Sequence, residues 1–518
     1  MNRPFRAAFF LLVAALVPLA ADVPATPSRP NIIIILSDDV GWGDLSSYGA
    51  TKVSTPHIDS LAASGLRFTD GHCTSSTCTP SRYSILTGQY AFRNKKAVIL
   101  PGNAPLVVDP AGPTLPKMMQ AAGYATGFVG KWHLGLGDGK IDWNGTISPG
   151  PDQIGFDYAY FLPATPDRVP CVYIQNQAVV GLTAGDPLAV NYQYKIGDEP
   201  TGKSRPDLLR YPADAQHSGT IVDHISRIGW MAGGHSAWWT DEEMAQRFLE
   251  QAQGFVLKNK DKPFFLYYCP HNIHVPRAPN GRFLHTSECG VRGDSIEELD
   301  ATVGAFLDTL RQAGLTKNTL IIFSSDNGPI FNDGYADGSV KEANGHKPAG
   351  PYRGGKYQIF EGGTRVPFIV SWPGTITPGT STALVNQLDL FASLGRLAGA
   401  PQSAATRPDS EDILPALLGR SQQGRTTMVE QDSGPTLALR EGPWKYFTPP
   451  PKTARGKLEE GDTTKGPPPP PGPQLYNLED DPHEDHNLAA QHPEIVKQMS
   501  EELAKIRDAG PQAAESQP

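Results

Sequence analysis

The sequence predicts an α/β fold with a large mixed, mostly parallel sheet sandwiched by helices. One observation is a set of short apolar runs rich in β-branched residues, the pattern of strands that are covered on both faces. The other is that segments with apolar residues at helical spacing lie between these runs. Strands and helices that alternate along a chain are typical of a parallel sheet with helices packed on it.

The individual elements follow in order along the chain. The predicted strands are Asn31 to Ser37, Tyr124 to Val129, Phe264 to Tyr268, Leu320 to Ser324 and Phe368 to Ser371. The predicted helices are Ile58 to Ser64, Leu115 to Ala122, Asp241 to Leu257 and Ile296 to Ala313. Ligands of such sheets bind at the carboxyl ends of the strands. We therefore expect the polar residues that follow the strands to form a site.

The composition changes after about residue 400, where the chain becomes polar and rich in proline and glycine. Thr427 to Gln431 and Trp444 to Phe447 are predicted short strands, and Pro493 to Asp508 is a predicted amphipathic helix. The proline run from Pro467 to Pro473 predicts an extended surface loop. Because 518 residues exceed the size of a single core, we expect three parts: a signal peptide at 1–25, a main α/β domain at 26–400 and a C-terminal α+β subdomain at 401–518.

The N-terminus has the pattern of a secretory signal. Arg3 and Arg6 precede the apolar run from Ala7 to Leu19, and small residues follow from Ala20 to Ala25. The alternative is a membrane anchor, but the run is shorter than the roughly 20 residues that span a bilayer. We expect an exported protein, periplasmic or secreted, with no membrane span after signal cleavage.

Composition narrows the possible functions. Charged residues make up 19% of the chain and hydrophobic residues 39%, which is ordinary for a soluble globular enzyme. The net charge of -9 argues against a surface for nucleic acid or anionic membranes. An anionic substrate would therefore need a local basic cluster.

The chain has five cysteines, and Cys78 stands in a distinctive motif. The other four allow three pairings in two disulfides, or four free thiols, and their spacing does not choose between these possibilities. They are Cys73, Cys171, Cys269 and Cys289.

The motif Cys78-Thr-Pro-Ser-Arg82, followed by Leu86-Thr-Gly88, resembles the signature of type I sulfatases of the alkaline phosphatase superfamily. In that family the cysteine is oxidised to formylglycine, so the resemblance implies that Cys78 is a modified residue and the precursor of the nucleophile. A hydrated aldehyde has two hydroxyls on one carbon: one attacks sulfur, and the other expels the bound sulfate as the carbonyl reforms. The alternative is a buried free cysteine or one half of a disulfide. Arg82, one turn further along a helix, would fix the hydrate.

Three further segments resemble family elements. Gly130 to Gly135 implies that Lys131 binds the sulfate and that His133 acts as a base. Their spacing points both side chains the same way only in extended backbone. The segment Phe264 to Pro276 implies that His274 binds sulfate or protonates the leaving alcohol, and Arg353 to Lys356 implies that Lys356 binds the sulfate and helps the leaving oxygen depart.

Four oxygen-bearing residues follow two of the predicted strands: Asp38, Asp39, Asp326 and Asn327. Adjacent carboxylates at a strand end are costly unless a cation neutralises them, although helix caps and solvated turns also contain such pairs. Oxygen-only sets favour hard cations, Ca2+ over Zn2+. The family implies the same ligands, with the hydrate at position 78 as a further one.

Substrate contacts are harder to predict. The loop from Phe156 to Tyr173 lies where sulfatases place a substrate loop, so Asp167 and Arg168 are candidates for gripping sugar hydroxyls, with a structural turn as the alternative. His271 and His346 are further candidates, and His271 could instead hydrogen-bond the turn. Glu361 and Arg365 are expected to have a structural role, as an ion pair, rather than to contact the substrate.

The resemblance implies an alkaline phosphatase-like fold and, from Leu439 to Lys445 and Leu475 to Pro482, a small C-terminal antiparallel sheet with a helix. It implies hydrolysis of sulfate monoesters of a sulfated carbohydrate, with galactose or N-acetylhexosamine sulfate favoured. The maturation partner would be a formylglycine-generating enzyme or an anaerobic sulfatase-maturating enzyme. Two alternatives are a phosphomonoester or phosphonate hydrolase of the same superfamily and a non-catalytic protein that binds sulfated glycans.

Overall fold

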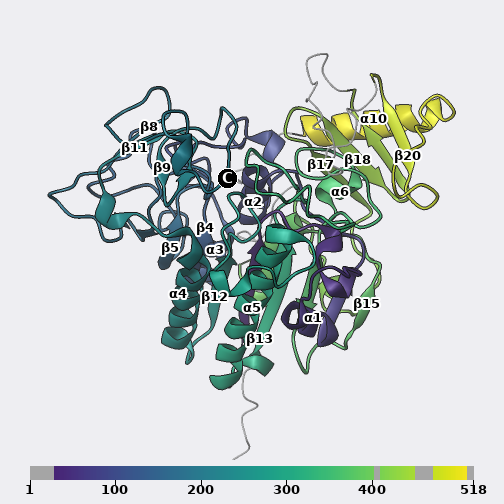
Figure 1. Cartoon of the computed structure of the whole chain (residues 1–518). Coiled ribbons are helices and arrows are strands. Elements are labelled where there is room, and N and C mark those ends of the chain that lie inside the picture. The colour runs from purple at the N-terminus through teal and green to yellow at the C-terminus, as the bar shows by residue number, and fades with distance from the viewer. Residues whose placement is uncertain (1–28, 402–408, 450–470, 510–518) are drawn as a thin grey trace, which may run out of the picture.

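The computed structural model describes residues 29–401, 409–449 and 471–509. The predicted signal segment and most of the proline run lie outside these residues. Within them, a ten-stranded mixed sheet forms the centre of the main domain (Figure 1). Its strands, in spatial order, are β15 (Gly379–Ser381), β2 (Gly65–Phe68), β14 (Phe368–Ser371), β13 (Thr319–Ser325), β1 (Asn31–Ser37), β12 (Phe264–Cys269), β4 (Ala125–Lys131), β5 (Tyr158–Leu162), β6 (Ile174–Gln175) and β7 (Ala178–Val179).

The middle of this sheet is parallel and buried. β1 pairs in parallel with β12 and β13, β12 pairs in parallel with β4, and β4 with β5. All seven residues of β1 are buried, as its run of isoleucines predicts. β14 is antiparallel to both of its neighbours, β13 and β2, whereas β2 pairs in parallel with β15, so the predicted mostly parallel, mixed sheet is confirmed.

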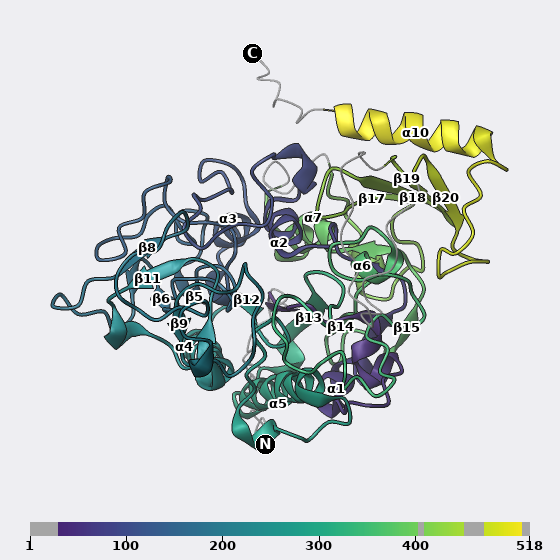
Figure 2. The same cartoon turned by 45° about the horizontal axis from the view of Figure 1, so that its top comes forward.

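Helices cover both faces of the sheet (Figure 2). α1 (Pro56–Ala63), α4 (Met244–Asn259) and α5 (Gly290–Gln312) pack together on one face. α2 (Cys78–Thr87), α3 (Leu115–Ala121) and α7 (Leu390–Ala398) pack together on the other. This is the sandwich that the alternating sequence pattern predicts.

Differences from the predicted elements have physical reasons. The strands that the sequence did not reveal, β2, β5, β6, β7 and β15, have two to five residues each, too few for a periodic signal. α5 begins at Gly290, six residues before the predicted start, because its polar first turns are buried through specific contacts. Arg292, for example, forms a bidentate pair with Asp44 at 2.6 and 2.7 Å.

The C-terminal subdomain is an antiparallel sheet with one helix across it, as predicted. Its strands are β17 (Thr427–Gln431), β18 (Leu437–Glu441), β19 (Trp444–Phe447) and β20 (Gln474–Asn477), and its helix is α10 (Pro493–Asp508). Met499 and Leu503 of α10 pack on Val429, Leu439 and Leu475 of the sheet.

Two sets of contacts join the subdomain to the main domain. Gln431, at the end of β17, exchanges backbone hydrogen bonds with Thr74 and Ser76, just before the Cys78 motif. Beside this contact lies a buried ion cluster whose members share carboxylate and cationic partners: Asp70, His72, Glu361, Arg365, Glu430, Arg440, Lys445 and Glu484. The predicted ion pair between Arg365 and Glu361 is part of it, at 2.6 Å.

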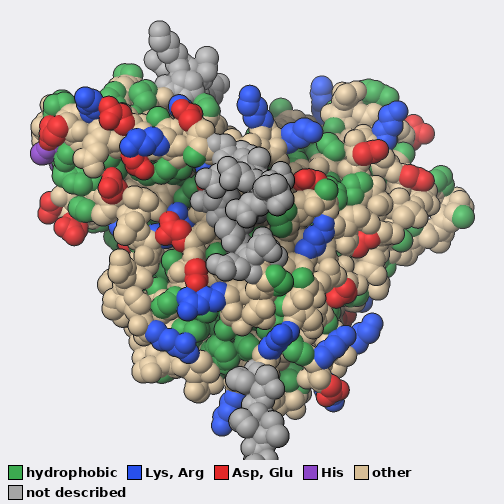
Figure 3. Space-filling model, turned by 180° about the vertical axis from the view of Figure 1, so that it is seen from behind, with side chains coloured by type: hydrophobic (Ala, Val, Ile, Leu, Met, Phe, Trp, Pro, Cys, Tyr) green, Lys and Arg blue, Asp and Glu red, His purple; other side chains and the backbone are tan. Residues whose placement is uncertain are grey.

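The structure also bears on the expectations for the cysteines and for a membrane span. All five cysteines are buried free thiols, which resolves the open choice against two disulfides. Among the residues described, no helix is long and apolar enough to cross a membrane. On the face shown in Figure 3, basic and acidic side chains are interspersed, so no single sign of charge dominates it.

Candidate active site

Several of the predicted site residues come from the carboxyl ends of four strands. Asp38 and Asp39 follow β1, Lys131 ends β4, and Asp326 follows β13, while β12 leads into the loop that carries His271 and His274. Because these strands pair side by side in parallel, their ends meet at one edge of the sheet.

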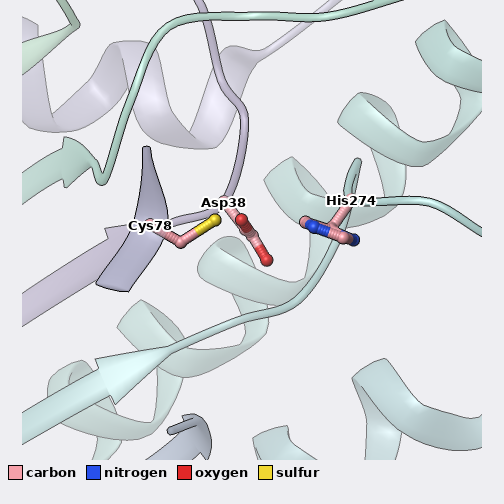
Figure 4. Close-up of side chains that lie close together, drawn as sticks. All are labelled: Asp38, Cys78 and His274. Carbon is pink, nitrogen blue, oxygen red and sulfur yellow. The ribbon is translucent and has the colours of Figure 1, made fainter. Parts of the chain in front are cut away.

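Cys78 is the first residue of α2, which runs from extended Thr77 to Gly88, a left-handed residue with φ of 64°. The Cys78 sulfur, a carboxylate oxygen of Asp38 and a ring nitrogen of His274 all lie within 4.8 Å of one another. The sulfur points toward the Asp38 carboxylate, and the His274 ring lies beyond that carboxylate, so that Asp38 is seen between Cys78 and His274 (Figure 4). Burial raises the pKa of the Cys78 thiol to about 12, so the unmodified thiol is neutral and a poor nucleophile near neutral pH.

Three buried carboxylates form an acid cluster: oxygens of Asp38, Asp39 and Asp326 lie within 4.8 Å of one another. Lys131 Nζ is 2.7 Å from Asp38 Oδ1 and 3.6 Å from Asp326 Oδ2. The side chain of Asn327 joins the cluster by donating from Nδ2 to Asp39 Oδ1 at 2.7 Å.

The acid cluster fits a hard divalent cation. In the described structure, Asp38 Oδ2 and Asn327 Oδ1 are buried oxygens without a hydrogen-bond partner, which is costly for a polar atom. Burial raises the pKa of Asp38 to about 8 despite Lys131, whereas for Asp39 burial is outweighed by Lys356 and Lys131, which hold its pKa below the usual value. A bound cation would be coordinated by the unpartnered oxygens, and its positive charge would favour the ionised form of Asp38.

His133 and His274, two of the histidines that line the cavity described below, are neutral. Burial, assisted by nearby Lys131, holds the pKa of His133 and of His274 well below the usual value, and Lys356 contributes for His274. His133 Nε2 is 3.0 Å from the carbonyl oxygen of Leu100, which can only accept, so the proton sits on Nε2 and Nδ1 is free to accept one. His274 Nδ1 is 2.7 Å from the carbonyl of Val275, which leaves Nε2 as the acceptor.

The backbone at His133 differs from the expectation. It has φ of 54°, so the segment from Lys131 to His133 is not extended throughout. Thr79 directly follows Cys78, and its hydroxyl donates to the His133 carbonyl at 2.8 Å. The two segments are thereby held against each other, and His133 still reaches the cavity.

A cavity of about 50 Å³ opens at this edge of the sheet, several times the roughly 10–15 Å³ that one water needs. Six of its lining residues are predicted site residues: Cys78, His133, Asp167, Arg168, His274 and Lys356.

Asp167 and Arg168 line the cavity as a pair. Arg168 Nη1 is 2.7 Å from Asp167 Oδ2, and His217 Nε2 is 3.3 Å from the same oxygen. Burial opposes ionisation of Asp167, but Arg168 outweighs it and the pKa of Asp167 falls well below its usual value. The result is a fixed carboxylate with hydrogen-bond donors on either side.

Other predicted residues lie outside the cavity lining. Arg82 contacts the acid cluster: its Nε and Nη2 are 2.9 and 2.8 Å from Asp326 Oδ2, and its Nη1 donates to the Lys131 carbonyl. Its predicted role in fixing the hydrate at position 78 stays a prediction. His346 Nε2 is 2.7 Å from Asp44, away from the cavity, because that carboxylate is buried and needs partners. His271 packs edge-on against Phe248.

The structure adds cavity residues that the sequence did not reveal. They are Ile99, Gln216, His217, Ile228, Asp333 and Tyr357. Asp333 Oδ2 is 3.0 Å from Lys356 Nζ, and both of its oxygens accept from the Tyr357 hydroxyl at 2.9 and 3.0 Å. Tyr357 directly follows the predicted Lys356 in the sequence, and this position could have marked it as a site residue. The other added residues belong to no motif that the sequence analysis identified.

An anion-sized cavity bounded by a cation site, lysines and neutral histidines at the carboxyl edge of this sheet defines a hydrolase of anionic esters. The sulfatase family model matches residues 30–400, and the chain belongs to the sulfatase family. It is a sulfuric ester hydrolase with the fold of the alkaline phosphatase superfamily.

Relatives cover nearly the whole chain. The chain is 48% identical to the N-acetylgalactosamine-6-O-sulfatase of Bacteroides thetaiotaomicron over 92% of its own length and 93% of the relative's. It is 34% identical to human arylsulfatase A, over 94% and 89%. A solved sulfatase structure of B. thetaiotaomicron, titled for glycosaminoglycan metabolism, superposes with a TM-score of 0.89 at 48% identity, covering 93% of this chain and 99% of that one. These homologues support hydrolysis of sulfate esters of sulfated sugars.

Proposed function

We propose that this protein is an exported, formylglycine-dependent sulfatase that uses Ca2+ and releases the 6-O-sulfate of N-acetylgalactosamine. The observation that carries the sugar assignment is the 48% identity, over more than nine-tenths of both chains, to the relative of that name. It selects one member of the predicted group of galactose and N-acetylhexosamine sulfates. Export rests on the N-terminal sequence pattern alone.

We assign the metal to Asp38, Asp39, Asp326 and Asn327, with the side chain at position 78 as a further ligand. The unpartnered oxygens of Asp38 and Asn327 support this assignment. Bound there, the cation would polarise a sulfate oxygen and lower the cost of ionising a hydroxyl. A maturation enzyme would act on Cys78 before folding, since the side chain is buried in the finished fold.

The chain's own groups then have separate tasks. Lys131 and Lys356 supply positive charge for the sulfate oxygens, and both are held charged because burial is outweighed by nearby carboxylates, chiefly Asp38 and Asp333, which raise each pKa. His133, with Nδ1 free, would accept a proton from a hydroxyl at position 78 once that residue is a hydrated formylglycine. Lys356 would donate to the leaving sugar oxygen, whereas His274, whose Nε2 accepts in the neutral ring, would have to take up a proton before it could donate there.

Asp167, Arg168 and His217 are assigned to the sugar. Their fixed carboxylate and flanking donors suit a pair of hydroxyls, and polar sites of this kind reject analogues that lack the matching group. Replacing His217 with Ala should therefore raise KM for the sugar substrate on the order of tenfold, while turnover of nitrophenyl sulfate, which has no sugar, changes little.

The direct test is a release assay with the 6-sulfates of N-acetylgalactosamine, galactose and N-acetylglucosamine, with N-acetylgalactosamine 4-sulfate and with nitrophenyl phosphate. We expect the highest kcat/KM for N-acetylgalactosamine 6-sulfate. Preference for the 4-sulfate would overturn the sugar assignment, and preference for the phosphate would favour the phosphohydrolase alternative. Peptide mass spectrometry of active protein should show residue 78 as formylglycine rather than cysteine.

A further inference from the structure

Asp333 is the unassigned charged group of the cavity. Its side chain is 18% exposed, whereas that of Lys356 is 2% exposed, so the carboxylate is the more solvent-exposed partner of this pair. Lys356 Nζ lies between two carboxylates, 2.9 Å from Asp39 Oδ2 and 3.0 Å from Asp333 Oδ2. Asp39 belongs to the acid cluster, but Asp333 does not.

The position of Asp333 is fixed by its neighbour. Tyr357 donates its hydroxyl to both Asp333 oxygens, and it holds φ of 77°, which non-glycine residues rarely adopt. The Tyr357 amide donates to the Ser76 carbonyl at 2.8 Å, which ties this backbone to the segment before Cys78. Strained backbone held from several sides is typical of functional positions.

The charges that line the cavity cancel. In the part of the chain that the structure describes, two cations line it, and each has a carboxylate from the same lining: Arg168 pairs with Asp167 at 2.7 Å, and Lys356 with Asp333 at 3.0 Å. Two positive and two negative charges sum to zero. His217 also lines the cavity; when protonated, its charge is balanced by Asp214, 2.8 Å from Nδ1 and outside the lining. Attraction for an anion must therefore come from the metal end of the site.

We propose that Asp333 is a specificity residue that matches the cavity to a singly charged anion. This rests on the proposed function. A sulfate monoester carries one negative charge, whereas the product, inorganic sulfate, and a phosphate monoester above its second pKa each carry two. Every added negative charge is repelled by the Asp333 carboxylate, so the residue disfavours dianions relative to the substrate. Asp333 would thereby weaken product inhibition and reject phosphate esters.

The test compares Asp333→Asn with Asp333→Glu, which keeps the charge, and with Asp207→Asn, which removes a carboxylate from an exposed surface pair with Arg205. Each matured protein is assayed at pH 8 with nitrophenyl sulfate and nitrophenyl phosphate, and inorganic sulfate is titrated as an inhibitor. Thermal melting and the mass of the Cys78 peptide check folding and maturation. Asp333→Ser is a second neutral variant if Asp333→Asn does not fold.

In the neutral variant, we expect the inhibition constant for inorganic sulfate to fall on the order of tenfold, because a unit charge a few ångströms away in a partly exposed site has an effect of that size. The ratio of kcat/KM for phosphate to that for sulfate should rise by a similar factor. Asp333→Glu, which keeps the negative charge, should change both quantities much less than Asp333→Asn does, and Asp207→Asn should keep the wild-type values.

Three results separate the alternatives. An unchanged or higher inhibition constant in both neutral variants would overturn the proposal. A higher KM for sugar substrates with unaltered inhibition by inorganic sulfate would also overturn it, since Asp333 would then be a sugar contact. If the wild type released no sulfate from any ester, the proposed function would fail, and calorimetric titration of wild type and Asp333→Asn with inorganic sulfate would still decide the role of Asp333.

Discussion

Replacing Lys445 with Met tests whether the buried ion cluster holds the two domains together. The ammonium is 2.8 Å from Glu361 Oε1, 2.9 Å from Glu430 Oε2 and 3.5 Å from Glu484 Oε1, and all four side chains are fully buried. Met keeps the apolar stem of the side chain but removes the charge, which leaves three carboxylates without a shared cation.

Breaking a buried ion pair by removing one partner costs about 3–5 kcal/mol. The lower end applies here because two carboxylates keep other partners: Glu361 keeps Arg365 at 2.6 Å, and Glu430 keeps His72 at 3.1 Å. Burial raises the pKa of Glu484 to about 8, so this group can take up a proton instead of remaining charged. We expect the free energy of unfolding to fall by about 3 kcal/mol.

The assay is urea unfolding followed by tryptophan fluorescence, to which Trp444 next to Lys445 contributes. Adding Glu484→Gln to Lys445→Met should recover at least about 1 kcal/mol, because one of the stranded carboxylates is removed. Lys505→Met, which breaks an exposed pair with Glu502 on α10, should leave stability unchanged. A loss below about 1 kcal/mol for Lys445→Met, or no recovery in the double variant, would refute the reasoning.

Three further predictions concern the catalytic machinery and pH. Cys78→Ala should abolish hydrolysis of nitrophenyl sulfate while the melting temperature stays close to wild type; a large loss of stability would instead mark the residue as structural. Chelation of divalent ions should lower both activity and melting temperature, because the carboxylates of Asp38 and Asp39 lose their neutralising cation, and Ca2+ should restore both; an unaltered melting temperature would contradict a bound metal. Burial raises the pKa of Glu298 from 4.5 to about 7, so the folded state retains a proton that the unfolded chain loses, and stability falls by up to about 3 kcal/mol as pH rises through that window. Glu298→Gln should remove this component in urea unfolding at pH 5 and pH 8, and an equal slope in both proteins would refute it.

Several elements could be predicted from the sequence because their signal is local. The apolar run Asn31–Ser37 is β1, and the predicted segments Thr427–Gln431, Trp444–Phe447 and Pro493–Asp508 are β17, β19 and α10 with the same bounds. A strand buried on both faces or an amphipathic helix carries its pattern within one stretch of chain. The short strands at the sheet edges carry no such pattern, since partners far along the chain stabilise them.

The residues that carry the chemistry of the site could also be predicted, because they belong to short sequence motifs around Cys78, Lys131, His274 and Lys356. The motifs did not predict which residues each side chain contacts in the folded protein. Arg82 lies in the Cys78 motif, but its guanidinium is held by Asp326, which is 244 positions away in sequence.

The sequence by itself determined the class of reaction and the order of the main elements, because both depend on residues close together along the chain. Only the tertiary structure decided the charge balance of the cavity. Asp333 and His217 have ordinary neighbours in the sequence, and they meet Lys356 and Asp167 only after loops from distant segments pack over the sheet edge. Electrostatic balance depends on distances in space, which a linear pattern does not contain.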